Sequence, residues 1–218
     1  MLRSAQIPVV PDFIARYGGT IEKYKRHEQI YAQGDRADRL YYVSSGKVIV
    51  SIITEEGKEA LIAVVGPQQL FGEDCLNVEA QRGSSVTAAT DCAVVAFRTS
   101  EVLRAFKHDP HFTRFFSAFL IERNSHLRAS LADQMLLSSE QRLARILLSL
   151  ASLENKAESE LVDIPFSQDM IARMVGTTRS RVNEFMNKFR KLGYIEYRQG
   201  QLRVHDSLNS LLKKDDSK

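Results

Sequence analysis

The sequence predicts an α+β chain in which an N-terminal β domain is followed by a long helix and a C-terminal winged helix-turn-helix. Three observations carry this prediction. Glycine-punctuated β-like runs occupy residues 21–97, a helical pattern opens at Asp109-Pro110, and two short helical patterns around Gly176 precede an alternating hairpin pattern. We expect a β-roll over residues 1–108, a dimerisation helix over 109–137 and the winged helix-turn-helix over 138–218.

The β domain is predicted from short runs such as YYVSSGKVIVSIIT, EALIAVVG, SSVTAAT and CAVVAF. Glycines at positions 34, 46, 57, 66, 72 and 83 punctuate these runs at near-regular intervals. Short, evenly spaced strands with glycine turns are typical of a β-roll, a jelly roll or a small barrel. Gly46-Lys47 and Gly57-Lys58 are predicted as turns between paired strands.

The long helix, which runs from Asp109-Pro110 to about Met135, carries too many apolar residues for one buried face. One stripe comprises Phe112, Phe115 and Phe119, and a second comprises Phe116, Leu120, Leu127 and Leu131. A helix with one solvent-exposed face needs only one apolar stripe, so two apolar stripes predict that two neighbouring elements pack against this helix. We expect the β domain to cover the first stripe and the same helix of a second subunit to cover the second. Burial within a monomer is the alternative.

Residues 166–192 follow the pattern of two helices joined by a tight turn. Ser167 can cap the first helix, Gly176 can end it, and Thr177 or Thr178 can cap a second helix that begins near Arg179. The predicted buried side of the second helix comprises Val182, Phe185, Met186, Phe189 and Leu192. Its predicted exposed side comprises Arg179, Ser180, Asn183, Glu184 and Asn187. This is a helix-turn-helix, whose second helix presents its first residues to the major groove.

A hairpin and a strong positive charge complete this segment. Residues 194–197 and 201–205 alternate like paired strands around Gln199-Gly200, with Arg198 and Arg203 beside the turn. Between Arg173 and Arg203 there are eight basic and two acidic residues, a net charge of +6, whereas the whole chain carries +3. Such a charge on a helix-turn-helix favours the phosphate backbone, so double-stranded DNA is the predicted partner.

The composition excludes several other classes. The chain has 218 residues, of which 44% are hydrophobic and 26% charged, as in ordinary globular proteins. The segment MLRSAQIPVVPDF has neither the pattern of a signal peptide nor that of an anchor, and no apolar run approaches the roughly 20 residues that span a bilayer. We expect a cytoplasmic protein without a membrane partner. No phosphate-binding glycine loop or Gly-x-Ser-x-Gly motif occurs, so the chain is predicted not to be an enzyme.

These features together resemble the cyclic-AMP receptor protein/FNR (CRP/FNR) family of bacterial transcription regulators. The resemblance covers residues from about Ile21 to Asp206. It is carried by Gly34-Asp35, Leu40-Tyr41-Tyr42-Val43, Ser45-Gly46-Lys47-Val48, Phe71-Gly72-Glu73 and the Val-Gly-x-Thr-Arg-x-x-Val run from Val175. It implies a β-roll like a cyclic-nucleotide-binding domain, a homodimer that binds a near-palindromic promoter site, and RNA polymerase as a further partner.

The resemblance also implies which residues contact DNA. Arg179 stands where the family has an arginine that contacts guanine, and its fork matches the O6 and N7 acceptors. Ser180 stands where several members have glutamate, and Glu184 where arginine is frequent, so a family consensus site does not transfer. The predicted base contacts are Arg179, Ser180, Asn183 and Glu184. The predicted phosphate contacts are Ser167, Gln168, Thr178, Arg181, Lys188 and Arg198.

An effector pocket is implied in the β-roll. Gly72-Glu73 matches the family pair that holds a ribose, and Arg82 matches the arginine that holds a cyclic phosphate. Gly83 stands in place of the family serine, with Ser84 one step later. Leu127 and Arg128 stand where small hydroxyl residues face adenine, and Leu127 has no donor for a base. A cyclic nucleotide, another effector and no effector therefore all stay open.

Other cofactors and functions are disfavoured. Cys75 and Cys92 are too few to hold an iron–sulfur cluster. Two residues after Cys75 stands Asn77, where haem-binding members have a histidine near a cysteine. The five histidines show no metal-ligand spacing, so no metal site is predicted. The alternative function is a cyclic-nucleotide-binding signalling module that binds protein rather than DNA, and the +6 segment argues against it.

Overall fold

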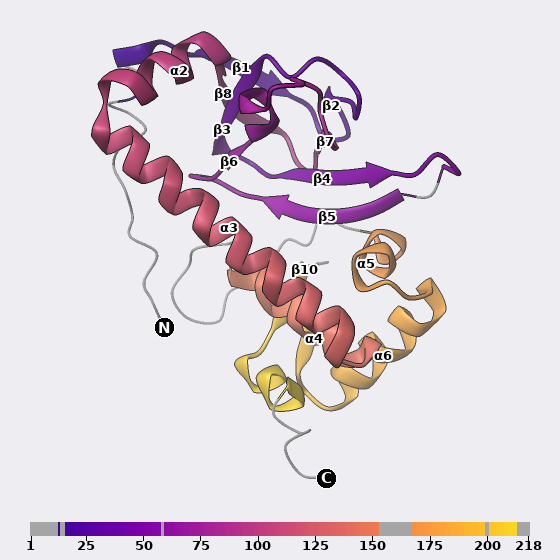
Figure 1. The fold of residues 1–218 in the computed structure, drawn as a ribbon. Helices are drawn as coiled ribbons and strands as arrows, with labels where there is room; N and C mark the ends of the chain where they lie inside the picture. The colour runs from indigo at the N-terminus through magenta and orange to yellow at the C-terminus, as the bar shows by residue number, and fades with distance from the viewer. Residues whose placement is uncertain (1–12, 14–15, 58, 153–166, 199–200, 213–218) are drawn as a thin grey trace. The chain divides into compact units, whose positions relative to one another are not determined.

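The computed structural model describes residues 13, 16–57, 59–152, 167–198 and 201–212 (Figure 1). Their contacts divide the chain into an N-terminal unit, residues 1–58 and 63–126, and a C-terminal unit, residues 59–62 and 127–218. The predicted α+β class is confirmed, because a β-sheet domain, a long helix and a helix-turn-helix with a small hairpin follow one another along the chain.

The β domain consists of two four-stranded sheets in its described residues. The first sheet has the order β1 (Thr20–Tyr24), β8 (Cys92–Arg98), β3 (Arg39–Ser45), β6 (Leu70–Phe71). The second has the order β2 (Gln29–Tyr31), β7 (Ser85–Ala88), β4 (Val48–Ile53), β5 (Glu59–Val65), and Figure 1 shows β4 and β5 side by side. Neighbours that are far apart in sequence, such as β1 and β8, pair antiparallel, as in a roll.

The connection from β3 to β4 differs from the prediction. Gly46-Lys47 was expected to join two paired strands, but β3 pairs with β8 and β6, whereas β4 pairs with β7 in the other sheet. Gly46 has φ of +79°, and a Cβ there would collide with the carbonyl oxygen of Asp91. The glycine therefore lets the chain cross from one sheet to the other in a confined space.

Alternating apolar residues of both sheets form the core between them. Val43, Val48, Val86 and Val94 are fully buried there. A second cluster lies on the other side of β3 and β8, where Phe97 meets helices α2 (Thr99–His108) and α3 (Pro110–Leu136). Because β3 and β8 are covered on both faces, their sequences contain continuous apolar runs.

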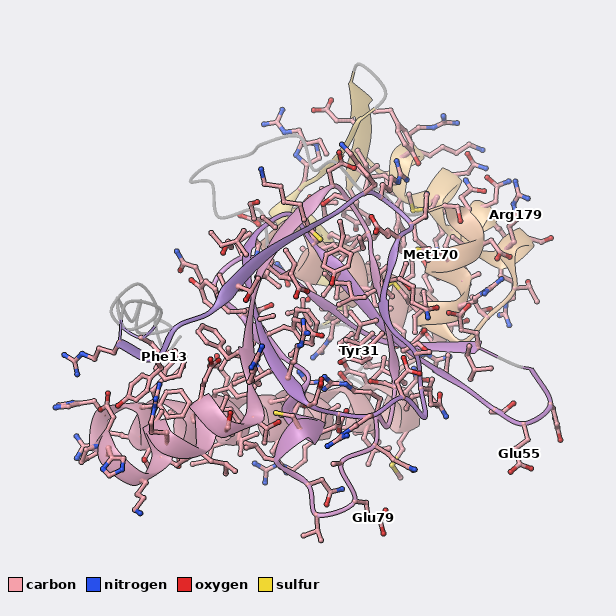
Figure 2. All side chains as sticks on the ribbon, turned by 90° about the horizontal axis from the view of Figure 1, so that it is seen from above. Phe13, Tyr31, Glu55, Glu79, Met170 and Arg179 are labelled. Atoms are coloured by element: carbon pink, nitrogen blue, oxygen red, sulfur yellow. The ribbon has the colours of Figure 1, made fainter. Side chains whose placement is uncertain are left out.

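The predicted start of the long helix is confirmed, whereas helix α2 was not predicted. The Asp109 carboxylate accepts from the backbone N–H groups of His111 (3.0 Å) and Phe112 (3.2 Å), and Pro110 occupies the first helical position. Phe112 stacks on Phe13, with ring centroids 4.4 Å apart, and Figure 2 shows Phe13 at the helical side of the β domain. The pattern Val102, Ala105, Phe106 could have indicated α2.

The C-terminal unit contains α4 (Ser139–Ser152), α5 (Gln168–Val175), α6 (Arg179–Lys191), the hairpin β9 (Ile195–Arg198) and β10 (Gln201–Val204), and the 3₁₀ helix η2 (Asp206–Leu212). A second 3₁₀ helix, η1 (Glu73–Leu76), lies in the β domain. The fully buried side chains of the C-terminal unit include Leu143, Leu147, Val175, Val182, Phe189, Ile195 and Leu208. Each of its helices and strand β9 thus contribute fully buried side chains, and Leu202 of β10 is also buried, at 5% exposed.

Candidate nucleic-acid interface

The turn between α5 and α6 is built by local capping. The Ser167 hydroxyl accepts from Met170 N–H (3.2 Å) at the start of α5, and Gly176, with φ of +71°, ends that helix. The Thr178 hydroxyl accepts from Arg181 N–H (3.3 Å) at the start of α6. These contacts confirm the predicted helix ends and decide between the two threonines in favour of Thr178.

Helix α6 is anchored by the side that the apolar pattern predicted, with one exception. Val182, Phe185, Met186 and Phe189 are all buried. Leu192, which was expected to extend this side, is 54% exposed. Leu192 is the C-terminal cap of α6 and keeps a right-handed helical backbone, with its N–H donating to the Lys188 carbonyl (3.0 Å), yet its side chain is not covered by the described residues.

The four predicted base contacts lie together on the opposite side of α6. Arg179, Ser180, Asn183 and Glu184 are all exposed. Among the described residues, the side chains of Arg179, Ser180 and Glu184 have no hydrogen-bond or ion-pair partner, and Figure 2 shows Arg179 at the edge of the C-terminal unit. Positions one turn apart share a helix face, so these side chains form one polar surface at the N-terminal half of α6.

Four of the predicted phosphate contacts lie in the first turns of α5 and α6 or at their N-caps. Ser167 and Thr178 use an oxygen lone pair as helix caps, which leaves each hydroxyl proton free to donate. Gln168 opens α5, and Arg181 is exposed with its guanidinium 5.7 Å from the centre of the Phe185 ring. All four lie at helix N-termini, where the helix dipole also favours an anion.

The two remaining predicted phosphate contacts differ from these four. The Lys188 ammonium lies 2.8 Å and 3.0 Å from the two carboxylate oxygens of Glu140 on α4. Lys188 must leave this ion pair to reach a phosphate, so we expect it to contribute less than Arg181 to DNA binding. The Arg198 side chain, like the hairpin turn at 199–200, lies outside the described residues.

The two strands of the hairpin pair as predicted, but Arg203 forms an ion pair within the hairpin. Arg198 is opposite Gln201 and Ile195 is opposite Val204. The Arg203 guanidinium donates to Glu196 at 3.0 Å, and His205 lies 3.7 Å from the same carboxylate. A cross-strand ion pair therefore holds Arg203 on the hairpin.

Arg142 connects the segments that meet at the start of α4. Its Nε donates to the Val175 carbonyl at the end of α5 (2.9 Å), and its Nη1 donates to the Leu137 carbonyl just after α3 (2.9 Å). Carbonyls at helix C-termini lack intrahelical partners, and the Arg142 guanidinium supplies a donor to one carbonyl at the end of α5 and to another just after α3. The turn before α6 is thus tied to the end of the long helix, a link that the sequence pattern did not reveal.

The second stripe of α3 is only partly what was predicted. Phe116 is 3% exposed and packs against Phe106 and Phe112 in the β-domain core, so it does not belong to an exposed stripe. Leu120, Leu127 and Leu131 are 41%, 50% and 61% exposed. Their separations of seven and four residues are those of a coiled-coil seam.

The predicted effector residues of the β domain gather around Arg82, which is 2% exposed. Its two terminal nitrogens donate to the carbonyls of Gly72 (2.9 Å) and Arg39 (2.7 Å), and its guanidinium lies 4.1 Å from the centre of the Tyr31 ring. A Cβ at Gly72 would lie 2.9 Å from Arg82, which explains the glycine. The buried Nε has no hydrogen-bond partner among the described residues.

The other effector residues are placed less favourably. Glu73 forms an ion pair with Arg123 on α3, with 2.9 Å between Oε1 and Nε. Gly83 donates its N–H to the Asp74 carboxylate (3.4 Å), and Ser84 beside it is half-buried. Leu127 and Arg128 are exposed and belong to the C-terminal unit, whereas the other four predicted residues belong to the N-terminal unit.

Comparisons with known proteins agree with this division. Residues 21–109 match the cyclic nucleotide-binding domain family, and residues 141–208 match the Crp-like helix-turn-helix domain family. The chain belongs to the CRP/FNR family of transcription regulators. This confirms the resemblance found in the sequence.

Named relatives support the same conclusion. The chain is 29% identical over 187 residues to the CRP-like cAMP-activated global transcriptional regulator of Mycobacterium tuberculosis, covering 84% of this chain and 83% of that protein. It is 28% identical over 184 residues to the cyclic AMP receptor protein of Thermus thermophilus, with the same coverage. The structure of FixK2 from Bradyrhizobium japonicum has the same fold, with a TM-score of 0.80 at 20% identity over 92% of this chain and 98% of that one.

This CRP/FNR-family protein is a DNA-binding transcription regulator. Its relatives are regulators and not enzymes, which confirms the prediction that it is not an enzyme. None of the helices in the described ranges has the length and apolar character needed to cross a membrane. The same ranges contain no cluster of three or more histidine, cysteine or acidic residues able to hold a metal.

The groups around Arg82 in this CRP/FNR-family member match only part of what a cyclic phosphate needs. The unpartnered Nε of Arg82 is a buried donor that an anion would satisfy. However, Asp74 accepts the Gly83 N–H that a phosphate would otherwise use, and Gly83 supplies no hydroxyl. An acidic side chain beside the cradle also repels a phosphate.

The cysteines are predicted to be unreactive in the folded protein. Both are buried, and burial raises the pKa of the Cys75 thiol to about 11 and also raises the pKa of Cys92. At pH 8 only about one Cys75 thiol in a thousand would then be a thiolate, the nucleophilic form. Iodoacetamide should therefore label both residues in denaturant and neither in the native protein. Native labelling as fast as that of free cysteine would contradict this expectation.

Proposed function

We propose that this regulator binds a near-palindromic promoter site as a homodimer, with α6 of each subunit in a major groove. The observation that carries the proposal is the distribution of partners along α6. Arg179, Ser180 and Glu184, in the N-terminal half, have none within the described chain, whereas Lys188 and Arg190 further along are bound by neighbouring side chains. Free polar groups at the first turns of a recognition helix are those that reach base edges.

The dimer is supported by the exposed leucine seam of α3, Leu120, Leu127 and Leu131. Two copies related by a two-fold axis would bury these side chains against each other and present two copies of α6 to one duplex. The half-sites would then lie one helical turn, about 34 Å, apart. Membership of the family further supports RNA polymerase as a partner at promoters and the cytoplasm as the location.

A salt series separates this function from the binding of a protein partner. Arg181 and Arg198 would neutralise four phosphates in a dimer, so the logarithm of DNA affinity should fall with the logarithm of salt with a slope of about −4. Selection from random duplexes at low salt should yield a near-palindrome. Affinity that is independent of salt, or selection without any enriched sequence, would contradict the proposal.

We further propose that an anionic effector of the β domain acts at Arg82, and that cyclic nucleotides are poor effectors. The unpartnered Nε supports the anion, and Asp74, Gly83 and the apolar Leu127 argue against a nucleotide phosphate and base. The family names of the relatives make cyclic AMP the first ligand to test. An anion would replace the missing acceptor of a buried donor, which is costly to leave unpaired.

Calorimetry with cyclic AMP and cyclic GMP at millimolar concentration is expected to show weak binding or none. Any stimulation of DNA binding by either nucleotide should be lost in Arg82→Ala, because the phosphate would lose its only buried cationic donor in the described β domain. DNA affinity without nucleotide controls for folding of the variant. Micromolar binding by the wild type would show that the β domain accepts a nucleotide after all.

A further inference from the structure

Two side chains outside the predicted base contacts, Asn187 and Arg190, form a hydrogen-bonded ladder along α6 with Asn183, which is a predicted base contact. Arg190 Nη2 donates to Asn187 Oδ1 at 3.2 Å, and Asn187 Nδ2 donates to Asn183 Oδ1 at 3.5 Å. The residues are separated by three and four positions, so they lie on one side of the helix. Asn183 is at the end of the ladder that faces Arg179, the predicted guanine contact.

The direction of this ladder follows from chemistry. A guanidinium only donates, so the atom of Asn187 that faces Arg190 has to be the oxygen. The Asn187 amide nitrogen then faces Asn183, which must present its own oxygen in return. The Asn183 Nδ2 is therefore left pointing away from the ladder, together with the second lone pair of its Oδ1. Arg190 thus determines which way the Asn183 carboxamide is turned.

A carboxamide held in this way offers one donor and one acceptor side by side. In the major groove only adenine presents the complement, an N7 acceptor beside an N6 donor. Guanine offers two acceptors, thymine an acceptor and a methyl group, and cytosine a donor. Asn183 lies four residues beyond Arg179, roughly 6 Å along the helix axis, which is less than two base-pair steps of about 3.4 Å.

We propose that Asn183 reads an adenine within two base pairs of the base read by Arg179, and that Asn187 and Arg190 are positioning residues that orient its carboxamide. This inference rests on the proposed function, in which α6 lies in the major groove. It adds the identity of one base and two residues that act without touching DNA bases. The competing account is that the ladder only stabilises α6 as exposed i,i+3 and i,i+4 pairs do.

The first experiment is site selection with the wild type and Asn183→Ala, followed by affinities on the selected duplex. The wild type should enrich an adenine that Asn183→Ala no longer prefers, with a loss of discrimination on the order of tenfold. Replacing that adenine by 7-deazaadenine, which lacks N7, should weaken the wild type, because the Asn183 Nδ2 loses its acceptor, and should leave Asn183→Ala unaffected. Asn183→Asp, which carries acceptors only, should prefer cytosine at this position.

The second experiment tests the positioning residues. Asn187→Ala should reduce the preference for adenine in the wild-type background and have no further effect in Asn183→Ala. Arg190→Ala should weaken binding to all duplexes by loss of charge and also reduce that preference, whereas Lys191→Ala, which removes the neighbouring charge, should leave the preference intact. Equal losses on all duplexes in Asn187→Ala would overturn the positioning role and support a helix-stabilising one.

The outcomes separate this inference from the proposed function. A wild type that selects a near-palindrome but shows no adenine dependent on Asn183, or that binds 7-deazaadenine equally well, overturns the inference and keeps the function. A wild type that enriches no sequence at all overturns both. Thermal melting of each variant checks that the C-terminal unit stays folded.

Discussion

Leu127→Glu is expected to convert the regulator from a dimer into monomers. Leu127 is half exposed in the single chain and occupies the middle of the α3 seam between Leu120 and Leu131. In the dimer the substitution would bury a carboxylate against its own symmetry mate, and an unpaired buried charge costs about 3–5 kcal/mol. The dimer dissociation constant should therefore rise by two to three orders of magnitude or more, on the basis that about 1.4 kcal/mol is tenfold.

Light scattering and sedimentation measure this change. Leu103→Glu is the matched control, because Leu103 is 54% exposed on α2, outside the seam, and should leave the dimer intact. The monomeric Leu127→Glu protein should also lose most of its affinity for a full palindrome, since each half-site would then be bound separately. If the wild type is monomeric at micromolar concentration, the prediction that the exposed leucines of α3 form a dimer interface is wrong.

Arg179→Ala is expected to weaken binding to the selected duplex by roughly 1–3 kcal/mol and to relax preference at one base pair in each half-site. Arg179 is the first residue of α6, its side chain is exposed, and no described residue holds its guanidinium. A free fork at this place can bond O6 and N7 of guanine together. Arg179→Lys should rescue poorly, because a point charge cannot make both bonds.

Arg181→Ala is the matched control for this prediction. It removes the same charge two residues further along, from a side chain that lies against the Phe185 ring rather than on the base-contacting side. It should weaken all duplexes about equally and reduce the salt slope by about one per subunit. Site selection on both variants gives the comparison. If Arg179→Ala keeps the complete sequence preference of the wild type, then α6 does not lie in the groove as proposed.

The sequence by itself determined the features that depend on short stretches of chain. Ser167, Gly176 and Thr178 bring about helix ends through contacts with residues two to four positions away, so their types are enough to predict α5 and α6. The same holds for Asp109-Pro110 at the start of α3 and for the buried side of α6 from Val182 to Phe189. The proposed DNA-binding surface follows from these, because the exposed side of a helix is the complement of its buried side.

Only the tertiary structure decided which side chains are buried or paired by residues far away in the sequence. Phe116 shares the spacing of the exposed leucines on α3, yet Phe106 from the preceding helix buries it in the β domain. Lys188 has the type and position of a phosphate contact, but Glu140, 48 residues earlier in the chain, forms an ion pair with it. The prediction of a hairpin turn at Gly46 was wrong because β3 pairs with β8 and β6 and β4 pairs with β7, strands that come much later in the chain. Periodicity records whether a side chain is apolar and where it points on its own element, whereas burial and ion pairing depend on what the rest of the chain places opposite it.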